Sequence, residues 1–307
     1  MLDLRALRYF TEIAAVGSFS EASRRLHVAQ PSLTRQIHNL ETDLGVILFV
    51  RLSRGVTLTE AGELLLDHAS RLLRDADRAA VAVREHGADP SGQVLLGLPP
   101  TLGPALLPPL IARLRSLYPR IALEIVPSRN ITIKEWLLTG RVDVAVVAQA
   151  SAEPDILLTE TAREEMVLLT GPGDTQRRFI PARDLAGMPV VGTESLLAIA
   201  NDLLQPTGTQ LKIDLVVNNL DAVRAMVRQS MCATVFPYSI VRGEHEAGLI
   251  TAHRILRHGL HRQLAVGVSV RRPQTAAMQV VMRLCAGIMS EVEAAGGFVL
   301  AAPPGAH

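Results

Sequence analysis

The first 45 residues carry apolar side chains at helical spacing, interrupted by two tight turns. The first apolar face ends before Gly17 and consists of Leu4, Leu7, Phe10, Ile13 and Ala14. This periodicity predicts an amphipathic helix. Ser18 and Glu21 then have the spacing of a capping box, in which Ser18 caps a second helix and Glu21 returns the hydrogen bond.

A third helix is predicted to begin at Pro31, because the missing N–H of proline costs nothing at a first helical position. Its buried face comprises Leu33, Ile37, Leu40 and Leu44, and Gly45 ends it. The opposite face is polar and comprises Gln30, Ser32, Thr34, Arg35 and His38. Two short helices of which the second has a polar N-terminal face predict a helix-turn-helix, since the DNA major groove admits one helix.

Residues 48–58 predict a β-hairpin with Arg54 and Gly55 near its tip. Such a wing would place Arg51 and Arg54 on phosphates or in the minor groove. Residues 1–58 hold seven arginines against five acidic residues, so a dimer would be needed for a useful electrostatic footprint. An ordinary three-helix bundle with a solvated polar face fits the same pattern, which by itself leaves both interpretations open.

Residues 59–86 predict one long helix, with Thr59 as its cap and Glu60 and Glu63 in the first turn. Apolar and small residues alternate four and three apart over almost three heptads. They are Leu65, Ala69, Leu72, Ala76, Ala79 and Val83. A seam of this kind predicts a dimerisation helix, and the alternative is a helix packed on its own domain.

Residues 87–92 form a Gly/Pro/Asp break that predicts a hinge between domains. After it, short Val/Ile/Leu runs alternate with helical patterns, which is typical of an α/β domain. The predicted strands are Val94–Leu98, Ala122–Val126, Val142–Ala148, Met166–Thr170, Val190–Gly192, Lys212–Val217, Ala233–Phe236 and Gln263–Val270. Residues 296–307 are small and rich in Pro and Gly, and predict a flexible tail.

Three predicted strand-to-helix junctions carry residues that cap helices. They include Pro100 and Thr101, Asn130, and Thr193 with Glu194 and Ser195. Ligands of open α/β sheets bind beyond the carboxyl ends of strands, where helix N-termini offer N–H donors. If the junctions share one cleft, it would suit a small polar or anionic ligand. Simple helix capping is the alternative, and it alone explains Asn130 and Ser195.

Composition excludes several classes of protein. The chain has 31 basic and 30 acidic residues, so a uniformly basic coat is excluded. Hydrophobic residues make up 48%, enough for a sizeable core. No apolar run is long enough to span a membrane, and the start lacks the apolar segment of a signal peptide. We therefore expect a cytoplasmic protein with no membrane partner.

Motifs for metals, cofactors and catalysis are missing from the sequence. Cys232 and Cys285 lie among apolar residues, which predicts buried thiols rather than redox sensors. His245, His253, His258 and His261 lack metal-ligand spacing, and a solvated surface is expected for them. Because no phosphate loop, catalytic carboxylate pair or nucleophile elbow occurs either, we expect no metal, no cofactor and no enzymatic activity.

Two N-terminal segments closely resemble the LysR-type transcriptional regulators. They are SFSEASRRLHVAQPSLTRQIHNLETDLG from Ser18 and LFVRLSRGVTLTEAG from Leu48. Three shorter segments are similar to the nitrogen-assimilation-control subgroup: GLPPT from Gly97, EWLLTGRVD from Glu135 and TVFPY from Thr234. Met231, Cys232 and Ala233 depart from the family, whose members usually have glycines there.

The resemblance implies a fold class and a domain organisation. It implies α/β architecture with an N-terminal all-α winged helix-turn-helix and a two-subdomain effector domain like a periplasmic binding protein. The expected ranges are 1–58 for DNA binding, 59–86 for the linker helix, 87–92 for the hinge, 93–295 for the effector domain and 296–307 for the tail. Subdomain I is expected at about 93–162 and 268–295, and subdomain II at about 163–267.

The resemblance also implies roles for residues. Gln30, Ser32, Thr34, Arg35 and Gln36 lie on the recognition helix, and Arg51 and Arg54 lie on the wing. Thr101 and Asn130 occupy places that line the family's cleft, and Pro237 is expected near the crossover between subdomains. We take Pro100, Thr101, Asn130, Thr193 and Pro237 as the effector-binding residues.

The sequence therefore predicts a sequence-specific DNA-binding transcriptional regulator modulated by a small-molecule effector between two α/β subdomains. The implied partners are an interrupted, dyad-symmetric DNA site, further copies of the chain in a dimer or tetramer, and RNA polymerase. The alternative is a cytoplasmic small-molecule-binding protein or enzyme with a helical N-terminal extension, and the helix-turn-helix at 18–45 distinguishes the two.

Overall fold

The computed structural model describes residues 3–84, 89–148, 154–173 and 179–300. The chain divides into two units, Met1–Ala88 and Asp89–His307, which are described separately. Among the described residues, no helix has the length and apolar character needed to cross a membrane.

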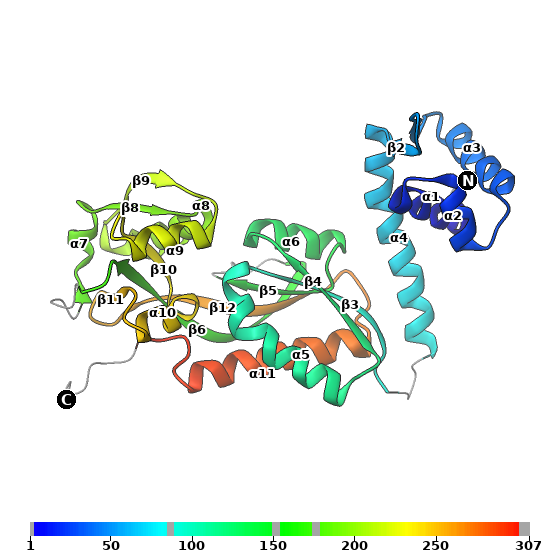
Figure 1. Ribbon diagram of the computed structural model, residues 1–307. Coiled ribbons are helices and arrows are strands. Elements are labelled where there is room, and N and C mark those ends of the chain that lie inside the picture. Colours follow the sequence, from blue (N-terminus) through cyan, green and yellow to red (C-terminus); the bar gives the residue numbers. More distant parts are fainter. Residues whose placement is uncertain (1–2, 85–88, 149–153, 174–178, 301–307) are drawn as a thin grey trace. The chain divides into compact units, whose positions relative to one another are not determined.

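The first unit is a helical domain with a two-stranded hairpin (Figure 1). Its elements are α1 (Leu4–Val16), α2 (Phe19–Leu26), α3 (Gln30–Leu44), β1 (Phe49–Arg51), β2 (Val56–Leu58) and α4 (Glu60–Arg84). The predicted helix-turn-helix, hairpin and long helix are all confirmed, and the long helix lies within this unit.

Local signals determine where these helices begin and end. Gly17 adopts φ 66°, the left-handed conformation that ends α1. Ser18 caps α2, because its Oγ accepts a hydrogen bond from Glu21 N at 3.4 Å. The second half of the predicted capping box is wrong. The Glu21 carboxylate instead accepts from Arg24 and Arg25, which lie one turn along the same helix and compete for it.

The recognition helix α3 begins at Gln30, one residue before its predicted start, and ends at Gly45 as predicted. Leu33, Ile37 and Leu40 are buried as predicted. The prediction for Leu44 is wrong, since this last helical residue lies beyond the buried core and is 37% exposed.

The wing is attached to the helices through one aromatic side chain and one glycine. The Phe49 ring centroid lies 5.2 Å from that of Phe10 and 5.7 Å from that of Phe19. A Cβ atom at Gly55 would lie 2.5 Å from the carbonyl oxygen of Gly17, so only glycine fits there. The adjacent Val56 N donates to the same oxygen at 2.9 Å, which holds the wing against the end of α1.

The second unit combines one large mixed sheet with a smaller parallel pair. Its strands are β3 (Gly92–Leu98), β4 (Ile121–Pro127), β5 (Val144–Ala148), β6 (Ile156–Thr170), β7 (Phe179–Ile180), β8 (Pro189–Gly192), β9 (Lys212–Val216), β10 (Thr234–Pro237), β11 (Thr251–Ile255) and β12 (Leu260–Ser269). Its helices are η1 (Pro100–Leu102), α5 (Gly103–Leu117), α6 (Asn130–Thr139), α7 (Ala182–Leu185), α8 (Glu194–Leu204), η2 (Gln205–Thr207), α9 (Leu220–Arg228), η3 (Tyr238–Ile240), α10 (Arg242–Glu246) and α11 (Ala276–Ala294).

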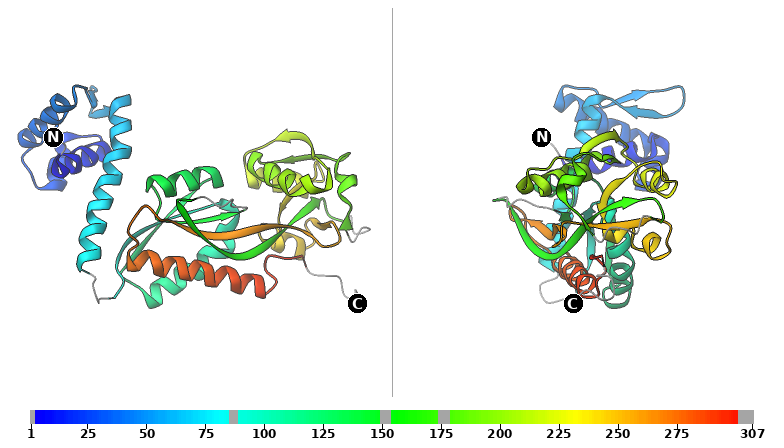
Figure 2. Two further views of the ribbon diagram at one scale, coloured as in Figure 1. Left: turned by 180° about the vertical axis from the view of Figure 1, so that it is seen from behind. Right: turned by 90° about the vertical axis from the view of Figure 1, so that its left-hand side faces the viewer.

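Subdomain I has three layers. The strand order β4-β3-β5-β12 forms its sheet, with β3 parallel to β4 and β5, and β12 antiparallel to β5. Helices α5 and α11 cover one face and α6 covers the other (Figures 1 and 2). In subdomain II, helices α8 and α9 pack against the second half of β6 and its neighbour β10. Strands β8 and β9 form the separate parallel pair.

Two long antiparallel strands, β6 and β12, run through both subdomains (Figure 2). Ala162 and Leu264 belong to the core of subdomain I, whereas Met166 and Leu260 belong to the core of subdomain II. The predicted range 163–267 for subdomain II is therefore wrong at its end, because β12 already enters subdomain I at Leu264.

The sequence prediction of the strands has further errors around this crossing. Strand β6 begins at Ile156, ten residues before the predicted start at Met166, and strands β7 and β11 were not predicted. Charged residues at 163–165 interrupt the apolar pattern of β6, so only the apolar end of the strand had a recognisable signal.

The predicted flexible tail is wrong for residues 296–300. Phe298 is 1% exposed in the core of subdomain I, and Leu300 is 9% exposed in the core of subdomain II. These two apolar side chains anchor a segment whose other residues are Gly296, Gly297 and Val299. Residues 301–307 lie outside the described residues.

Candidate nucleic-acid interface and effector cleft

The N-terminal part of α3 presents polar side chains on its surface. Gln30, Ser32 and Arg35 are exposed, while Thr34 and Gln36 are half-buried. Gln30 Oε1 accepts a hydrogen bond from Ser20 Oγ at 2.8 Å, which links α3 to the preceding helix α2. A polar helix end held in this way has the shape and donors needed to reach base edges.

Three exposed arginines of α3 and the wing have no ion-pair partner among the described residues, and the same holds for Arg5 on α1. The three are Arg35, Arg51 and Arg54. By contrast, Arg8 pairs with Asp77 at 2.6 Å, and Arg25 pairs with Glu12 at 3.4 Å. The guanidinium groups of α3 and the wing are therefore available to contact phosphates.

The predicted seam on α4 divides into two parts. Ala69 is fully buried in the core of the first unit, and Leu65 packs against the same core. For these two residues the alternative prediction, packing on the helix's own domain, holds. Leu72 is 47% exposed and Ala79 is exposed, so their side of the helix remains open. Ala76 is half-buried, and the side chain of Val83 lies outside the described residues.

The predicted effector-binding residues come from both subdomains of the second unit. Pro100 and Thr101 lie in η1 at the carboxyl end of β3, and Asn130 is the first residue of α6. Thr193 caps α8, and Pro237 ends β10. Thr101, Thr193 and Pro237 are buried, Asn130 is half-buried and Pro100 is exposed.

Helix capping explains the role of Thr193 but does not explain that of Asn130. Thr193 Oγ1 accepts from Leu196 N at 3.4 Å, as a capping residue does. Helix α6 has Arg129 at its N-cap without a side-chain cap, so the capping role predicted for Asn130 is wrong. The Asn130 amide instead bonds both backbone groups of Ala148 at the end of β5, with Ala148 N to Oδ1 at 3.2 Å.

A buried ion pair joins the two subdomains beneath Thr101. Arg262 on β12 lies opposite Glu164 on β6, and both side chains are at most 1% exposed. Arg262 donates to Glu164 Oε2 from Nε at 3.0 Å and from Nη2 at 2.7 Å. Nη2 also donates to Thr101 Oγ1 at 3.1 Å.

The other carboxylate oxygen of Glu164 faces subdomain II. Oε1 accepts from Ser239 N at 3.3 Å and from the Ser239 hydroxyl in η3. The network therefore runs from η1 in subdomain I to η3 in subdomain II. No local sequence pattern indicates these residues, because 98 positions separate Glu164 from Arg262.

A second ion pair connects the subdomains at the two helix N-termini. Arg129 Nη1 lies 2.9 Å from Glu194 Oε2, and both side chains are exposed. Arg129 precedes α6 of subdomain I and Glu194 is the first residue of α8 of subdomain II. Arg129 therefore partly compensates the negative charge of Glu194 at this junction.

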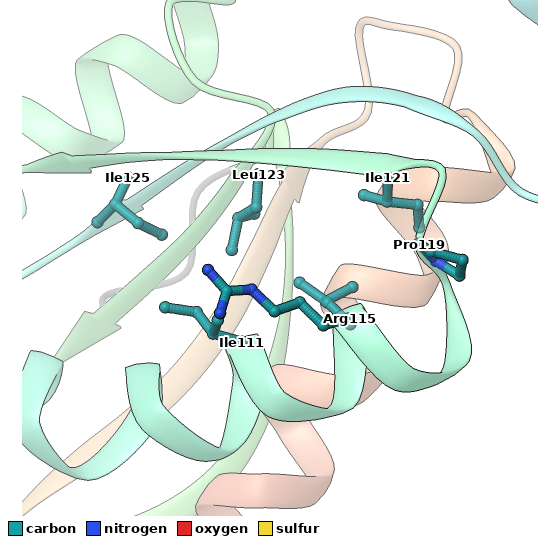
Figure 3. Close-up of a pocket in the computed structure, with 7 residues that line it drawn as sticks. Ile111, Arg115, Pro119, Ile121, Leu123 and Ile125 are labelled. Atoms are coloured by element: carbon teal, nitrogen blue, oxygen red, sulfur yellow. The ribbon is translucent and has the colours of Figure 1, made fainter.

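An aliphatic groove of about 280 Å³ lies apart from these residues, between α5 and β4 (Figure 3). It is lined by Ile111, Leu114, Arg115, Pro119, Ile121, Leu123 and Ile125. The Arg115 side chain extends over the groove between Ile111 and Leu123 (Figure 3). The lining contains none of the predicted effector-binding residues.

The histidines predicted on a solvated surface occupy different environments. His258 is exposed as predicted, but His253 is 2% exposed, with Nε2 2.9 Å from Thr170 Oγ1. The prediction is wrong for His253 because β11 is an internal strand of the sheet. Within the described ranges, no group of three or more His, Cys, Asp or Glu side chains is placed to hold a metal ion.

The two thiols are disfavoured as thiolates. Cys285 is fully buried, as predicted, and burial raises its pKa to about 12. Cys232 is only half-buried, so the prediction holds in part. Burial and the nearby Asp214 carboxylate raise the pKa of the Cys232 thiol.

Comparison with known proteins supplies the family context. Residues 4–63 match the bacterial regulatory helix-turn-helix proteins of the lysR family, and residues 87–289 match the LysR substrate binding domain. The nitrogen assimilation regulatory protein nac of Klebsiella aerogenes is 29% identical over 293 residues, covering 94% of this chain and 96% of nac. This agrees with the subgroup resemblance, and the relatives are regulators rather than enzymes.

Solved structures share the fold over almost the full length. A full-length OxyR variant from Pseudomonas aeruginosa has a TM-score of 0.69 at 25% identity, covering 94% of this chain and 95% of that one. CbnR, solved in complex with its target DNA, has a TM-score of 0.55 at 24% identity, covering 93% and 100%.

The thiol environments predict slow alkylation of the folded protein. At pH 8, Cys285 should react with iodoacetamide about a thousandfold more slowly than a free thiol, because almost none of it is thiolate. Mass spectrometry of the Cys232→Ser variant isolates this residue, and denaturation should restore full reactivity. Fast native modification of Cys285 would contradict the prediction.

Proposed function

Because the chain belongs to the LysR family of transcriptional regulators, we propose that α3 reads base edges in the major groove while the wing holds the DNA backbone. The proposed base-contacting residues are Gln30, Ser32, Thr34, Arg35 and Gln36, and the proposed backbone contacts are Arg51 and Arg54. A DNA-reading regulator acts on the chromosome, so we propose a cytoplasmic site of action.

The observation that carries this proposal is the pairing of the arginines. Three exposed guanidinium groups on α3 and the wing have no ion-pair partner among the described residues, whereas Arg8 and Arg25 are paired internally. Unpaired arginines at a helix N-terminus and on a wing are the donors that guanine and phosphate require.

We further propose that α4 dimerises through its exposed side, which includes Leu72. A two-fold dimer presents two recognition helices, so its operator is expected to be dyad-symmetric and interrupted. The dimer also doubles the modest basic excess of one DNA-binding domain. A tetramer formed from two dimers extends the same symmetry.

We propose that a small polar or anionic effector binds between the subdomains, near Thr101 and Thr193. Two observations support this location. Thr193 caps the eleven-residue helix α8, and the N-terminus of a helix of this length offers N–H donors to an anion. The Arg129–Glu194 pair also joins the two subdomains there, so a ligand at this junction would contact both. Binding would then shift the balance between open and closed arrangements.

The DNA contacts are tested with Arg35→Ala. Loss of one base contact costs about 1–3 kcal/mol, so the affinity for selected genomic fragments should fall about fivefold or more. Fluorescence anisotropy over a salt series measures the affinity and its salt slope. The control is Arg115→Ala, which removes the same charge from the exposed surface of α5. No wild-type binding at low salt, or equal losses in both variants, would contradict the proposal.

The dimer is tested with aspartate in the open part of the seam. Leu72→Asp combined with Ala76→Asp should convert dimers to monomers, because a buried unpaired carboxylate is costly at an apolar interface. Sedimentation velocity measures the change. Leu64→Asp is the control, since Leu64 is 64% exposed on the same helix but outside the seam. Dimers that persist in the double variant would contradict dimerisation through this side of α4.

The effector cleft is tested by screening small metabolic anions and polar compounds for thermal stabilisation. Thr193→Ala should weaken the binding of any hit about fivefold, the equivalent of one hydrogen bond. Asn219→Ala is the matched control, because Asn219 Oδ1 caps α9 by accepting from Ala222 N at 3.0 Å. Both variants lose a helix cap, so an equal loss of ligand response would argue against the cleft.

A further inference from the structure

The chain that follows α11 passes from subdomain I to subdomain II at residues 296–300, here called the strap. Phe298 is 1% exposed and belongs to the apolar core of subdomain I. Leu300, two residues later, is 9% exposed and belongs to the core of subdomain II. One short segment therefore has an anchor in each core.

The strap leaves α11 in a fixed direction. Gly296 adopts φ 71°, a conformation that turns the chain back after the helix. Gly297 N donates to Val292 O at 2.7 Å, and a Cβ atom at Gly297 would lie only 2.7 Å from Val292 Cγ1. The start of the strap thus lies tightly against the last turn of α11, which itself packs on subdomain I.

A buried carboxylate holds the middle of the strap at the crossing strand β6. Glu165 N donates to Phe298 O at 2.9 Å, and Leu300 N donates to Glu165 Oε2 at 2.9 Å. The Glu165 side chain is fully buried and pairs with Arg254 Nε on β11 at 2.7 Å. Arg254 Nη2 also donates to Leu300 O, so both backbone groups of Leu300 are bonded to this ion pair.

The strap is therefore a third connection beside β6 and β12. Two adjacent strands allow the subdomains to bend and twist about the crossing. A third segment, anchored in both cores, opposes that motion because any change of angle must move Phe298 or Leu300 within close-packed surroundings.

We propose that residues 296–300 form a conformational strap that sets the angle between subdomains I and II. Release of Leu300 from the core of subdomain II permits a wider opening, while Phe298 keeps the segment attached to subdomain I. The strap goes beyond the proposed DNA and effector contacts and requires neither ligand.

The test measures distances between the subdomains in the full-length chain. Spin labels are attached at Ile131→Cys on α6 and Ala198→Cys on α8, both exposed positions, in a Cys232→Ser background. The labelled protein is mixed with a large excess of unlabelled chain, so that each oligomer holds at most one labelled copy. The distances from double electron–electron resonance then lie within one chain. We expect one narrow distance distribution for the labelled parent protein. Leu300→Ala should add a second, displaced population.

The matched control is Leu185→Ala, which truncates a fully buried leucine of the same core on α7. It should destabilise subdomain II without adding the second population. If Leu300→Ala fails to fold, the same distance measurement on Leu300→Val tests the proposal. The proposed strap is overturned by an unchanged distance distribution in the Leu300 variants, or by the same second population in Leu185→Ala. Since no effector or DNA is added, either result leaves the proposed function untouched.

Discussion

Two adjacent buried carboxylates on β6 fix the place where the two subdomains of the second unit meet. Successive side chains of a strand point to opposite faces, so Glu164 and Glu165 bind different partners. Glu164 binds Arg262, while Glu165 binds Arg254 and Leu300 N. A buried carboxylate that loses its partner costs about 3–5 kcal/mol, so each partner is strongly held in position. The way the two subdomains meet at the crossing strands follows from this constraint.

On the Glu164 side, residues of the proposed cleft bond directly to the crossing strands. Thr101 from subdomain I and Ser239 from subdomain II bond to the same ion pair from opposite ends. A ligand that displaced the Thr101 hydroxyl would therefore alter the hydrogen bonding of Arg262. Coupling between the proposed ligand and the subdomain angle needs no long path, because the Arg262 guanidinium bonds both Thr101 of η1 and Glu164 of the crossing strand β6.

Much of the first unit could be predicted from the sequence, and the cleft could not, for a physical reason. Gly17, Ser18 and Gly45 act on residues within four positions, so local spacing identifies the helices and the recognition face. Arg262, the ion-pair partner of Glu164, lies 98 positions away, and Ala148, the partner of Asn130, lies 18 positions away, so neither pairing has a local sequence signal. Capping chemistry made Asn130 a reasonable helix cap, whereas its amide satisfies the end of a neighbouring strand.

The arginines of the chain have two different roles, one inside the fold and one on its surface. The chain has 31 basic and 30 acidic residues, and this near balance conceals two populations of arginine. Arg262 and Arg254 neutralise buried carboxylates, so their positive charge is compensated inside the fold. Arg35, Arg51 and Arg54 have no ion-pair partner in the part of the chain that the structure describes, and their charge extends to solvent. The net charge of a regulator therefore says little about its DNA affinity, because arginines without internal partners contribute most to the field that DNA meets.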